Sequence, residues 1–460
     1  MFITTQLDSP DRPPAPPNPP KHLHQMMKRQ AANAVTAELS PEDQTDLPRD
    51  RPFEPWRRAA TARTTELVRA VVDLVERREA EVSPRKRRRR PVDQRVMEDT
   101  VEALVCDAVH RELTAPGGRV MVSLSNQVLG TRSRYRAPVL SKALPHILDM
   151  LFGSVLEVSK GHRNPFGKAL QTTVALTSDF RKTVQARAVS LQDIRRDQGG
   201  ELIILKQARE DYWSGGALLE YDDTPETNRY RIELERINAT IAALDLDFDQ
   251  GHRRAGQVDL RDRTLRRIFN NGRFDHGGRL YGGFWQALSK KDRAAALRID
   301  DDVTVTLDYR QMGPRLLYAR SGAKPPADCY AVPGFEQYRS GWKKLLNALF
   351  FAGPELARLP KGTADLLPER IGAQKAVQLL LDHNAPIAQY VHRDVGFEIM
   401  FAESQLLVAL LLELERQQIT ALPIHDAIIV PEHQEDEALE TMTDVFETQT
   451  GLPGEVSREG

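Results

Sequence analysis

An alternating strand in the C-terminal half of the chain ends on a carboxylate. In TVTLDYRQMGPR, residues 304–315, apolar side chains alternate with threonines in the period of two that predicts a half-buried β-strand. Asp308 then takes the next place, and Gly313 and Pro314 stop the strand before Arg315. We infer that Asp308 stands at the end of this strand because its carboxylate takes part in a chemical reaction.

A second acid has a similar setting. In ALPIHDAIIVPE, residues 421–432, apolar runs flank the pair His425 and Asp426. A charge inside an apolar hairpin must be paired or bound to a metal ion. Two carboxylates on adjacent strands, Asp308 and Asp426, can hold two divalent ions roughly 3.5–4 Å apart, which is the arrangement for in-line phosphoryl transfer. A structural ion pair is the alternative for either acid taken alone.

A helix predicted over residues 338–353 lies between the two acids. YRSGWKKLLNALFFAG places Arg339, Lys343 and Asn347 on one face, four residues apart, and Phe351 continues that face. Two cations and an aromatic ring on one face suit a triphosphate and a base. An amphipathic helix whose cations face solvent is the alternative.

A glycine-rich loop precedes the first acid. FDHGGRLYGGFWQ, residues 274–286, has glycines that allow tight turns and close approach of another backbone. Arg279 and the neighbouring aromatic residues can therefore lie against a nucleic-acid backbone.

Composition excludes several classes of protein. The 460 residues contain 64 basic and 65 acidic side chains, so the net charge indicates no partner. Only Cys106 and Cys329 are present, without metal-ligand spacing, which favours a reducing compartment. The N-terminal sequence has no apolar signal region, and the run LLVALLL at 406–412 is too short to span a membrane. We expect a cytoplasmic protein with no membrane partner.

Five segments follow from changes in composition along the chain. Residues 1–55 are proline-rich and predicted to be disordered, and 56–95 form a charged helix and a basic arm that contains RKRRRR. Residues 96–186 form a compact domain, and 187–264 form a helical connector or thumb. Residues 265–460 alternate strands and helices and carry the chemistry, so the predicted fold class is α+β.

The compact domain has the element order of a winged helix. A helix, a short strand, two helices and a two-stranded ribbon are predicted in that order, with the basic loop GHRNPFGKA, 161–169, between the ribbon strands. TRSRYR, 131–136, precedes the longer helix and would contact phosphates. A small mixed domain with a basic rim is the alternative.

Four motifs, in this order, resemble those of the family A DNA polymerases and the single-subunit phage and mitochondrial RNA polymerases. DHGGR (275–279) is similar to the element before the palm that contacts the template–primer hybrid. DYRQMGPRLLYA (308–319) resembles motif A, R-x-x-x-K-x-x-x-N-x-x-x-F (339–351) resembles motif B, and HD (425–426) resembles motif C. The resemblance covers about residues 265–435. It implies a right-hand polymerase palm, an antiparallel sheet with helices, and short fingers, because Lys343 and Glu403 are close in sequence.

The resemblance also implies roles for single residues. Asp308, Asp426 and the backbone carbonyl of Tyr309 would bind two Mg²⁺ (or Mn²⁺) ions, which activate the primer 3′-hydroxyl and neutralise the triphosphate. Lys343 would be catalytic, clamping the phosphates with Arg339 and protonating pyrophosphate. The other implied substrate contacts are Asn347, Phe351, Gly313 and Tyr309. The implied nucleic-acid contacts are Asp275, Arg279, His425 and Arg315. Of these, Arg315 is expected to brace the site by pairing with nearby acids.

Three departures from the family pattern concern the substrate. Gly313 stands where family A DNA polymerases have a glutamate that crowds the ribose 2′-hydroxyl, as in the single-subunit RNA polymerases. Phe351 replaces the usual tyrosine, and Asn347 replaces an aromatic residue or methionine. Without the glutamate no steric gate is evident, so relaxed selection between ribonucleotides and deoxyribonucleotides is our hypothesis.

The predicted function is a template-directed nucleotidyltransferase, a DNA polymerase or a primase-like polymerase. Its partners would be nucleoside triphosphates and a DNA or RNA template–primer, in the replication of a plasmid, phage or mobile element. One alternative is a winged-helix replication initiator with an inactive palm. The other is a metal-dependent nuclease, which explains the two acids but not the helix with Arg339 and Lys343.

Overall fold

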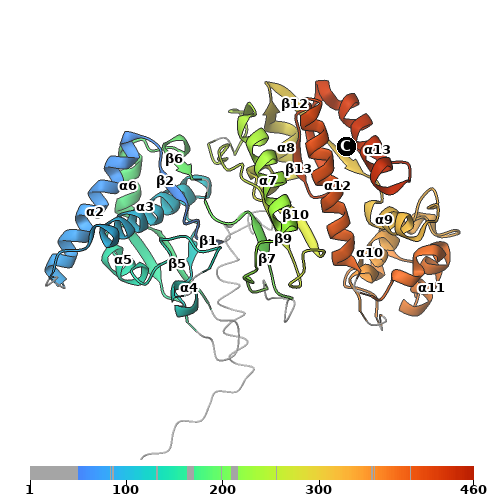
Figure 1. Ribbon diagram of the computed structural model, residues 1–460, viewed down its shortest axis with the longest axis horizontal. Coiled ribbons are helices and arrows are strands. Elements are labelled where there is room, and N and C mark those ends of the chain that lie inside the picture. The colour runs from blue at the N-terminus through green and yellow to red at the C-terminus, as the bar shows by residue number, and fades with distance from the viewer. Residues whose placement is uncertain are drawn as a thin grey trace, which may run out of the picture.

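The fold is mixed α+β (Figure 1), and three hydrophobic cores are found among the described residues. The first is built from residues 59–194, the second from 203–446, and the third from 317–399, a segment inserted within the second along the chain. Within the described part of the chain, every helix is too short or too polar to act as a membrane span. The computed structural model describes residues 50–459 except 83, 85–86, 131–132, 163–169, 198, 209–215, 255, 354–355, 357 and 394.

The first core joins a four-stranded sheet, order β1-β3-β5-β4, to the helices α2, α3 and α5. Leu67, Val71 and Val75 recur at helical spacing and bury one face of α2 in this core. Helix α3 begins at Pro91, whose fixed φ suits a first helical turn. The elements are β1 Arg51–Pro52, β2 Arg57–Ala59, α2 Ala62–Val82, α3 Pro91–Thr114, β3 Val120–Val122, α4 Asn126–Gly130, α5 Leu144–Leu151, β4 Leu156–Ser159, β5 Thr172–Leu176, α6 Ser178–Ala186 and β6 Ile194–Arg196.

Along residues 96–186, α3, β3, α4, α5, β4 and β5 occur in the predicted order, and helix α6, which was not predicted, follows them. One residue of this domain that is predicted to contact nucleic acid makes contacts within the protein instead. Arg134, expected to meet phosphates, donates to Asp223 at 2.9 Å and to the carbonyl of Tyr221 at 2.7 Å. Most of the basic loop, residues 163–169, lies outside the described residues.

The predicted disordered tail extended too far into the chain. β1 pairs in parallel with β3, and the N–H of Phe53 donates to the carbonyl of Met121 at 2.9 Å. Residues 51–53 therefore pair with the first sheet, and residues 1–49 of the predicted tail lie outside the described residues. In the predicted basic arm, Arg89 forms an ion pair with the buried Glu79 at 2.5 Å.

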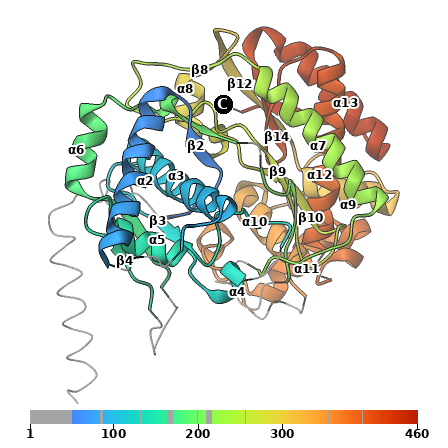
Figure 2. The ribbon, with the colours of Figure 1, turned by 60° about the vertical axis from the view of Figure 1, so that its left-hand side comes forward.

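The second core surrounds an antiparallel sheet, order β13-β14-β12-β11-β8, in which β15 also pairs with β12. Helix α12 contacts β10, α7 and α13, and these elements lie side by side in Figures 1 and 2. Much of the predicted connector, from residue 203 to 248, belongs to this core. The elements are β7 Ile203–Leu205, α7 Pro225–Ala243, β8 Leu246–Phe248, β9 Arg266–Phe269, β10 Gly277–Tyr281, α8 Lys290–Ala296, β11 Leu297–Ile299, β12 Asp302–Tyr309, α12 Gly396–Arg416, β13 Leu422–Ile424, β14 Ala427–Pro431, α13 Glu435–Thr450 and β15 Val456–Arg458.

The third core is a small helical cluster at the lower right of Figure 1. Trp342, Leu345 and Leu349 bury one face of α10 in it, and the opposite face of that helix is exposed. The first turn of α12 also packs here, so this helix connects the second and third cores. The helices are α9 Met312–Ser321, α10 Arg339–Phe350 and α11 Ala373–His383.

A buried ion network joins the first core to the rest of the molecule. Arg57 of β2 pairs with Asp259 at 2.8 Å and with Asp262 at 3.1 Å, and His110 of α3 contacts Asp259 at 2.8 Å. The Arg57 side chain is only 3% exposed. Because removal of one partner would leave buried charges uncompensated, this network fixes the two parts together.

Candidate active site

Asp308 and Asp426 lie side by side at one end of the main sheet. In the antiparallel pair of β12 and β14, Asp308 is opposite Ala427, the residue that follows Asp426. Asp426 occupies the two-residue turn between β13 and β14, with His425 before it. His425 has a φ of 58°, a left-handed conformation that suits the first position of a tight hairpin turn. The hairpin thus brings the second acid to the end of the strand that carries the first.

The environment of Asp308 disfavours an unaccompanied negative charge. Burial raises the pKa of this carboxyl to about 7, and the nearby carboxylates of Asp426 and Glu459 act in the same direction. Lys343 and Lys290 lower the pKa but do not offset burial. The Oδ1 atom of Asp308 is buried and has no hydrogen-bond partner among the described residues. A bound cation would satisfy this oxygen.

These two acids fit a divalent cation that prefers oxygen ligands. Mg²⁺ typically takes one or two protein carboxylates and completes its shell with water and substrate phosphates. Asp308 supplies a buried oxygen without a partner, and Asp426 supplies a second carboxylate beside it. The part of the chain that the structure describes contains no group of three or more His, Cys, Asp or Glu side chains placed to hold a metal ion. A metal ion held by these two acids would take its further ligands from water, a backbone carbonyl or the substrate.

A cavity of about 230 Å³ opens beside Asp426. It lies between the start of α9, the exposed face of α10 and the first half of α12, with β10 contributing Arg279. Six residues predicted for the site share this cavity, which are Arg279, Gly313, Lys343, Asn347, Phe351 and Asp426.

Helix α10 presents the predicted polar face to this cavity. Lys343 and Asn347 are exposed, while Trp342 and Leu346 on the other face are buried. Lys343 has no ion-pair or hydrogen-bond partner among the described residues, and it is close enough to Asp308 to influence the pKa of that carboxyl. An unpaired ammonium beside two acids is suited to binding an anion that also carries a metal ion, such as a triphosphate.

Phe351 stands at the mouth of the cavity, immediately after α10. Its side chain is 47% exposed, and its ring lies on Gly396 so closely that a Cβ at that glycine would be 2.4 Å from the ring. Phe397 contacts Phe351 edge to face, with ring centroids 5.5 Å apart. Because Gly396 has no side chain, the Phe351 ring can lie against it and present an exposed aromatic surface at this mouth, where a planar group can stack.

Arg339, predicted to share the phosphate clamp with Lys343, is engaged elsewhere. Its Nε donates to Asp328 at 2.5 Å, and its guanidinium lies 5.2 Å from the centre of the Tyr330 ring. Arg339 does not line the cavity, although Tyr330 does. Asp328 lies 11 residues earlier and outside α10, so the spacing within the helix cannot reveal that it binds this cation.

Arg315 is buried and braces the C-terminal segment against α9. Its guanidinium donates to the carbonyl of Pro453 at 2.8 Å and forms an ion pair with Glu455. This pairing with an acid is a bracing contact of the kind predicted for Arg315, and it engages the guanidinium within the protein. Tyr309 directs its hydroxyl to the carbonyl of Met442 at 2.8 Å, so only its backbone carbonyl is a candidate ligand.

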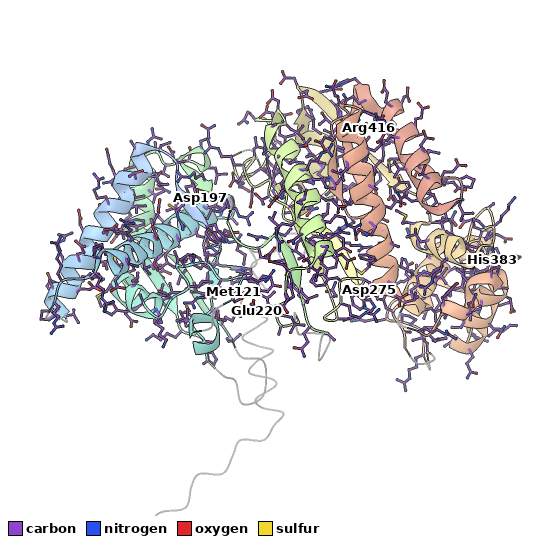
Figure 3. The ribbon with its side chains drawn as sticks, viewed as in Figure 1. Met121, Asp197, Glu220, Asp275, His383 and Arg416 are labelled. Atoms are coloured by element: carbon purple, nitrogen blue, oxygen red, sulfur yellow. The ribbon has the colours of Figure 1, made fainter. Side chains whose placement is uncertain are left out.

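Two further predicted nucleic-acid contacts lie outside the cavity. Asp275, labelled in Figure 3, is exposed and pairs with Arg273 at 2.6 Å. His425 is exposed at the hairpin turn, with its ring centroid 6.1 Å from that of Tyr281. Burial lowers the pKa of His425, and the Arg279 guanidinium adds to this effect, so the imidazole is neutral near pH 7. A neutral imidazole at this turn can donate one hydrogen bond to a nucleic-acid strand.

Glu403 is a site residue that the sequence-based prediction missed. It lies on α12, lines the cavity and forms an ion pair with Arg279. Burial raises the pKa of this carboxyl, and the Arg279 guanidinium opposes the shift. A signal was present in the sequence, because Glu403 falls on the helical stripe of Ile399, Leu406 and Leu407, where an apolar residue is expected.

Two larger cavities, of about 630 and 840 Å³, lie on either side of Trp56, far from the two acids in sequence and in fold. Many of their charged side chains are paired with one another, including Arg57 with Asp259 and Arg134 with Glu201. The smaller cavity, beside Asp426, differs in that the lining ammonium of Lys343 has no partner among the described residues.

No protein-family model matches this chain, and no curated protein sequence matches it. Among solved structures, it is similar to the POL domain of Pol1 from M. smegmatis, solved in complex with DNA primer-template and dNTP. The match has a TM-score of 0.31 and 12% identity, and covers 51% of this chain and 50% of that one. The chain thus spans about half the length of that structure, and the likeness is weak.

Proposed function

We propose that this protein is a template-directed nucleotidyltransferase that extends a primer from nucleoside triphosphates. One observation carries the proposal. Three groups come together from separate elements: the Asp308 oxygen, which has no partner among the described residues, the Asp426 carboxylate and the Lys343 ammonium, and the last two line one edge of the cavity. Such an edge can hold metal ions and triphosphate oxygens together.

Asp308 and Asp426 would hold the divalent ions, Mg²⁺ or Mn²⁺, with the backbone carbonyl of Tyr309 as a further ligand. Ions bound there supply charge neutralisation for the triphosphate and a lowered pKa for an attacking hydroxyl. The chain itself fixes the positions of these two carboxylates. The hairpin turn at His425 fixes Asp426 beside Asp308, and β14 and β15 hold β12 from its two sides.

The cavity would hold the incoming nucleotide in an extended orientation. Lys343 would bind the phosphates and can donate a proton to the leaving pyrophosphate. The exposed ring of Phe351 would stack on the base, and Asn347, one turn before it, would contact the nucleotide between them. Arg339 is left out of this assignment because Asp328 holds its guanidinium.

The first domain would bind DNA in the manner of a winged helix, and the whole protein would act in replication of a plasmid, phage or mobile element. The proposed DNA binding by the first domain is supported by the order of elements from α3 to β5, with the short helix α4 before the ribbon β4–β5. Electrophoretic mobility shifts of double-stranded DNA with the full chain test this part.

Primer extension tests the central proposal. Full-length protein is incubated with a labelled primer–template, Mg²⁺ and nucleoside triphosphates, beside Asp426→Ala and the matched surface control Asp444→Ala on α13. We expect extension by wild type and by the control, and none by Asp426→Ala. Binding of DNA without extension by any protein would favour an initiator with an inactive palm. Degradation of the template that depends on Asp426 would favour a nuclease.

A further inference from the structure

Glu403 brings a carboxylate into the cavity from α12. Its side chain is 8% exposed, and it is surrounded on its own helix by buried residues such as Ile399 and Leu407. A carboxylate in such a place is unfavourable unless it is paired. Arg279 of β10 provides that pairing, so the orientation of Glu403 is fixed.

The pairing with Arg279 uses only one of the two carboxylate oxygens. Oε2 accepts the hydrogen bond from Arg279, and Oε1 has no hydrogen-bond partner among the described residues. Oε1 is also the oxygen nearest Gly313, where it lies 4.0 Å from the point that a Cβ would occupy. An unused acceptor therefore faces the space that the glycine leaves open.

The space beside Gly313 is large enough for an additional oxygen of a ligand. A Cβ built at this residue would approach Ile399 no closer than 3.5 Å and Phe350 no closer than 3.6 Å, which are ordinary van der Waals distances. Gly313 does not need its glycine for a left-handed backbone, because it is not among the positive-φ residues. The open space is thus available to a ligand at this point of the cavity.

The residues that line the cavity together with Glu403 indicate which ligand group would meet this acceptor. Lys343 and Asp426 lie on the same cavity as the stacking ring of Phe351, and the proposed function assigns the first two to phosphates and the third to a base. The nucleotide group between phosphate and base is the sugar, whose only hydrogen-bond donors are hydroxyls. We propose that Glu403 Oε1 accepts a hydrogen bond from the ribose 2′-hydroxyl, so that the site prefers ribonucleoside triphosphates.

This inference rests on the proposed function only in that a nucleoside triphosphate occupies the cavity. Glu403 acts as a specificity-determining residue, and Gly313 provides the space for the hydroxyl. A hydrogen bond to a charged acceptor that is absent with the deoxy substrate discriminates by about tenfold or more.

The substrate side of the test needs no mutation. Equilibrium dissociation constants and single-nucleotide extension rates are measured for ATP, dATP and 2′-fluoro-2′-deoxy-ATP with the full chain and Mg²⁺. Fluorine approximates the size of the hydroxyl but cannot donate a hydrogen bond. We expect ATP to be preferred about tenfold over both analogues. Equal use of ATP and the fluoro analogue, or a preference for dATP, would overturn the proposal.

Two variants and one control test the protein side. Glu403→Gln keeps the shape of the side chain and removes its charge, and Gly313→Ala fills the space beside it; each is expected to reduce the ATP-to-dATP preference about tenfold. The control is Glu398→Gln, also on α12, whose glutamate pairs with Arg320 outside the cavity. An unchanged preference in Glu403→Gln, or equal loss of ATP and dATP, would rule out this role for Glu403.

The two proposals fail in different ways. If wild type shows no extension but binds ATP more tightly than dATP, and Glu403→Gln removes that difference, the sugar contact stands and the polymerase proposal fails. If wild type extends primers with ATP and dATP equally well, the polymerase proposal stands and the sugar contact fails.

Discussion

Ser457 of β15 lies directly opposite Asp308 of β12 in an antiparallel pair. On the other side of β12, the partner of Asp308 is Ala427 of β14. The strand that carries the acid is therefore held on both sides, and the N–H of Glu459 donates to the carbonyl of Thr306 at 2.8 Å. Strand pairing on both sides of Asp308 keeps its backbone in place, so that its carboxylate stays beside that of Asp426.

The ion pair of Arg315 with Glu455 is expected to stabilise this arrangement. Glu455→Ala leaves the buried guanidinium with only the carbonyl of Pro453 as a described hydrogen-bond partner, so we expect a loss of about 1–3 kcal/mol in the free energy of unfolding. Urea denaturation measures the loss. Glu447→Ala on exposed α13 surface is the control and should change stability by less than about 0.5 kcal/mol. Equal stability of the two variants would contradict the bracing role.

The raised pKa of Asp308 predicts opposite effects of pH on stability with and without divalent ions. The unfolded carboxyl ionises near its ordinary pKa, and the folded one near 7. Between these values the folded state binds more protons than the unfolded state, so this group's contribution to stability falls as pH rises to about 7.

Asp308→Asn removes that contribution and tests its sign. In chelator, we expect the substitution to raise the midpoint of thermal unfolding at pH 8 and to leave it nearly unchanged at pH 4. Added Mg²⁺ should stabilise wild type more at pH 8 than at pH 6, because only the ionised carboxylate binds it, and should not stabilise the variant. A midpoint for Asp308→Asn that falls at pH 8 would be inconsistent with a buried, unsatisfied acid.

Lys343 is expected to act on phosphates rather than on the fold. Lys343→Ala should reduce the extension rate at limiting nucleotide by about 10²-fold, the usual effect of removing one group that stabilises transition-state charge. The adjacent Lys344 is the matched control, because its amine donates to the carbonyl of Gly362 at 2.9 Å and it does not line the cavity. Comparable losses in Lys344→Ala would show that the helix has been disturbed.

The close contact of Gly396 with Phe351 predicts an effect of a residue that has no side chain of its own with which to bind a nucleotide. A Cβ at Gly396 would be 2.4 Å from the ring, so Gly396→Ala must displace Phe351. We expect nucleotide binding to weaken about 5- to 150-fold, as for Phe351→Ala, since one stacking contact contributes about 1–3 kcal/mol. Gly372→Ala, with no atom within 4 Å of the added Cβ, is the control. Normal nucleotide binding by Gly396→Ala would exclude the stacking role.

Local patterns predicted the elements on which the site is built. The alternation before Asp308 corresponds to β12, and the two apolar runs around Asp426 are β13 and β14. Spacing of four residues placed Lys343 and Asn347 on the exposed face of α10. Such predictions hold because a strand or a helix fixes which face each residue occupies.

Contacts between distant segments were not predictable in this way. Asp328 captures Arg339, and Arg279 meets Glu403, although nothing in either local sequence indicates the partner. The hypothesis of a site without a steric gate rested on Gly313 alone, and it did not anticipate a carboxylate arriving from α12. A single acid on an apolar helical stripe was the only local indication.

The buried network of Arg57, Asp259 and His110 bears on where synthesis would begin. Dissolved ions weaken exposed pairs far more than buried ones, so the first domain should keep its orientation when ionic strength changes. A DNA segment gripped by that domain would therefore present its strand to Asp308 and Asp426 at a constant offset, counted in nucleotides. On the proposed function, the spacing between the two sites would then be set by the fold and not by the ionic strength.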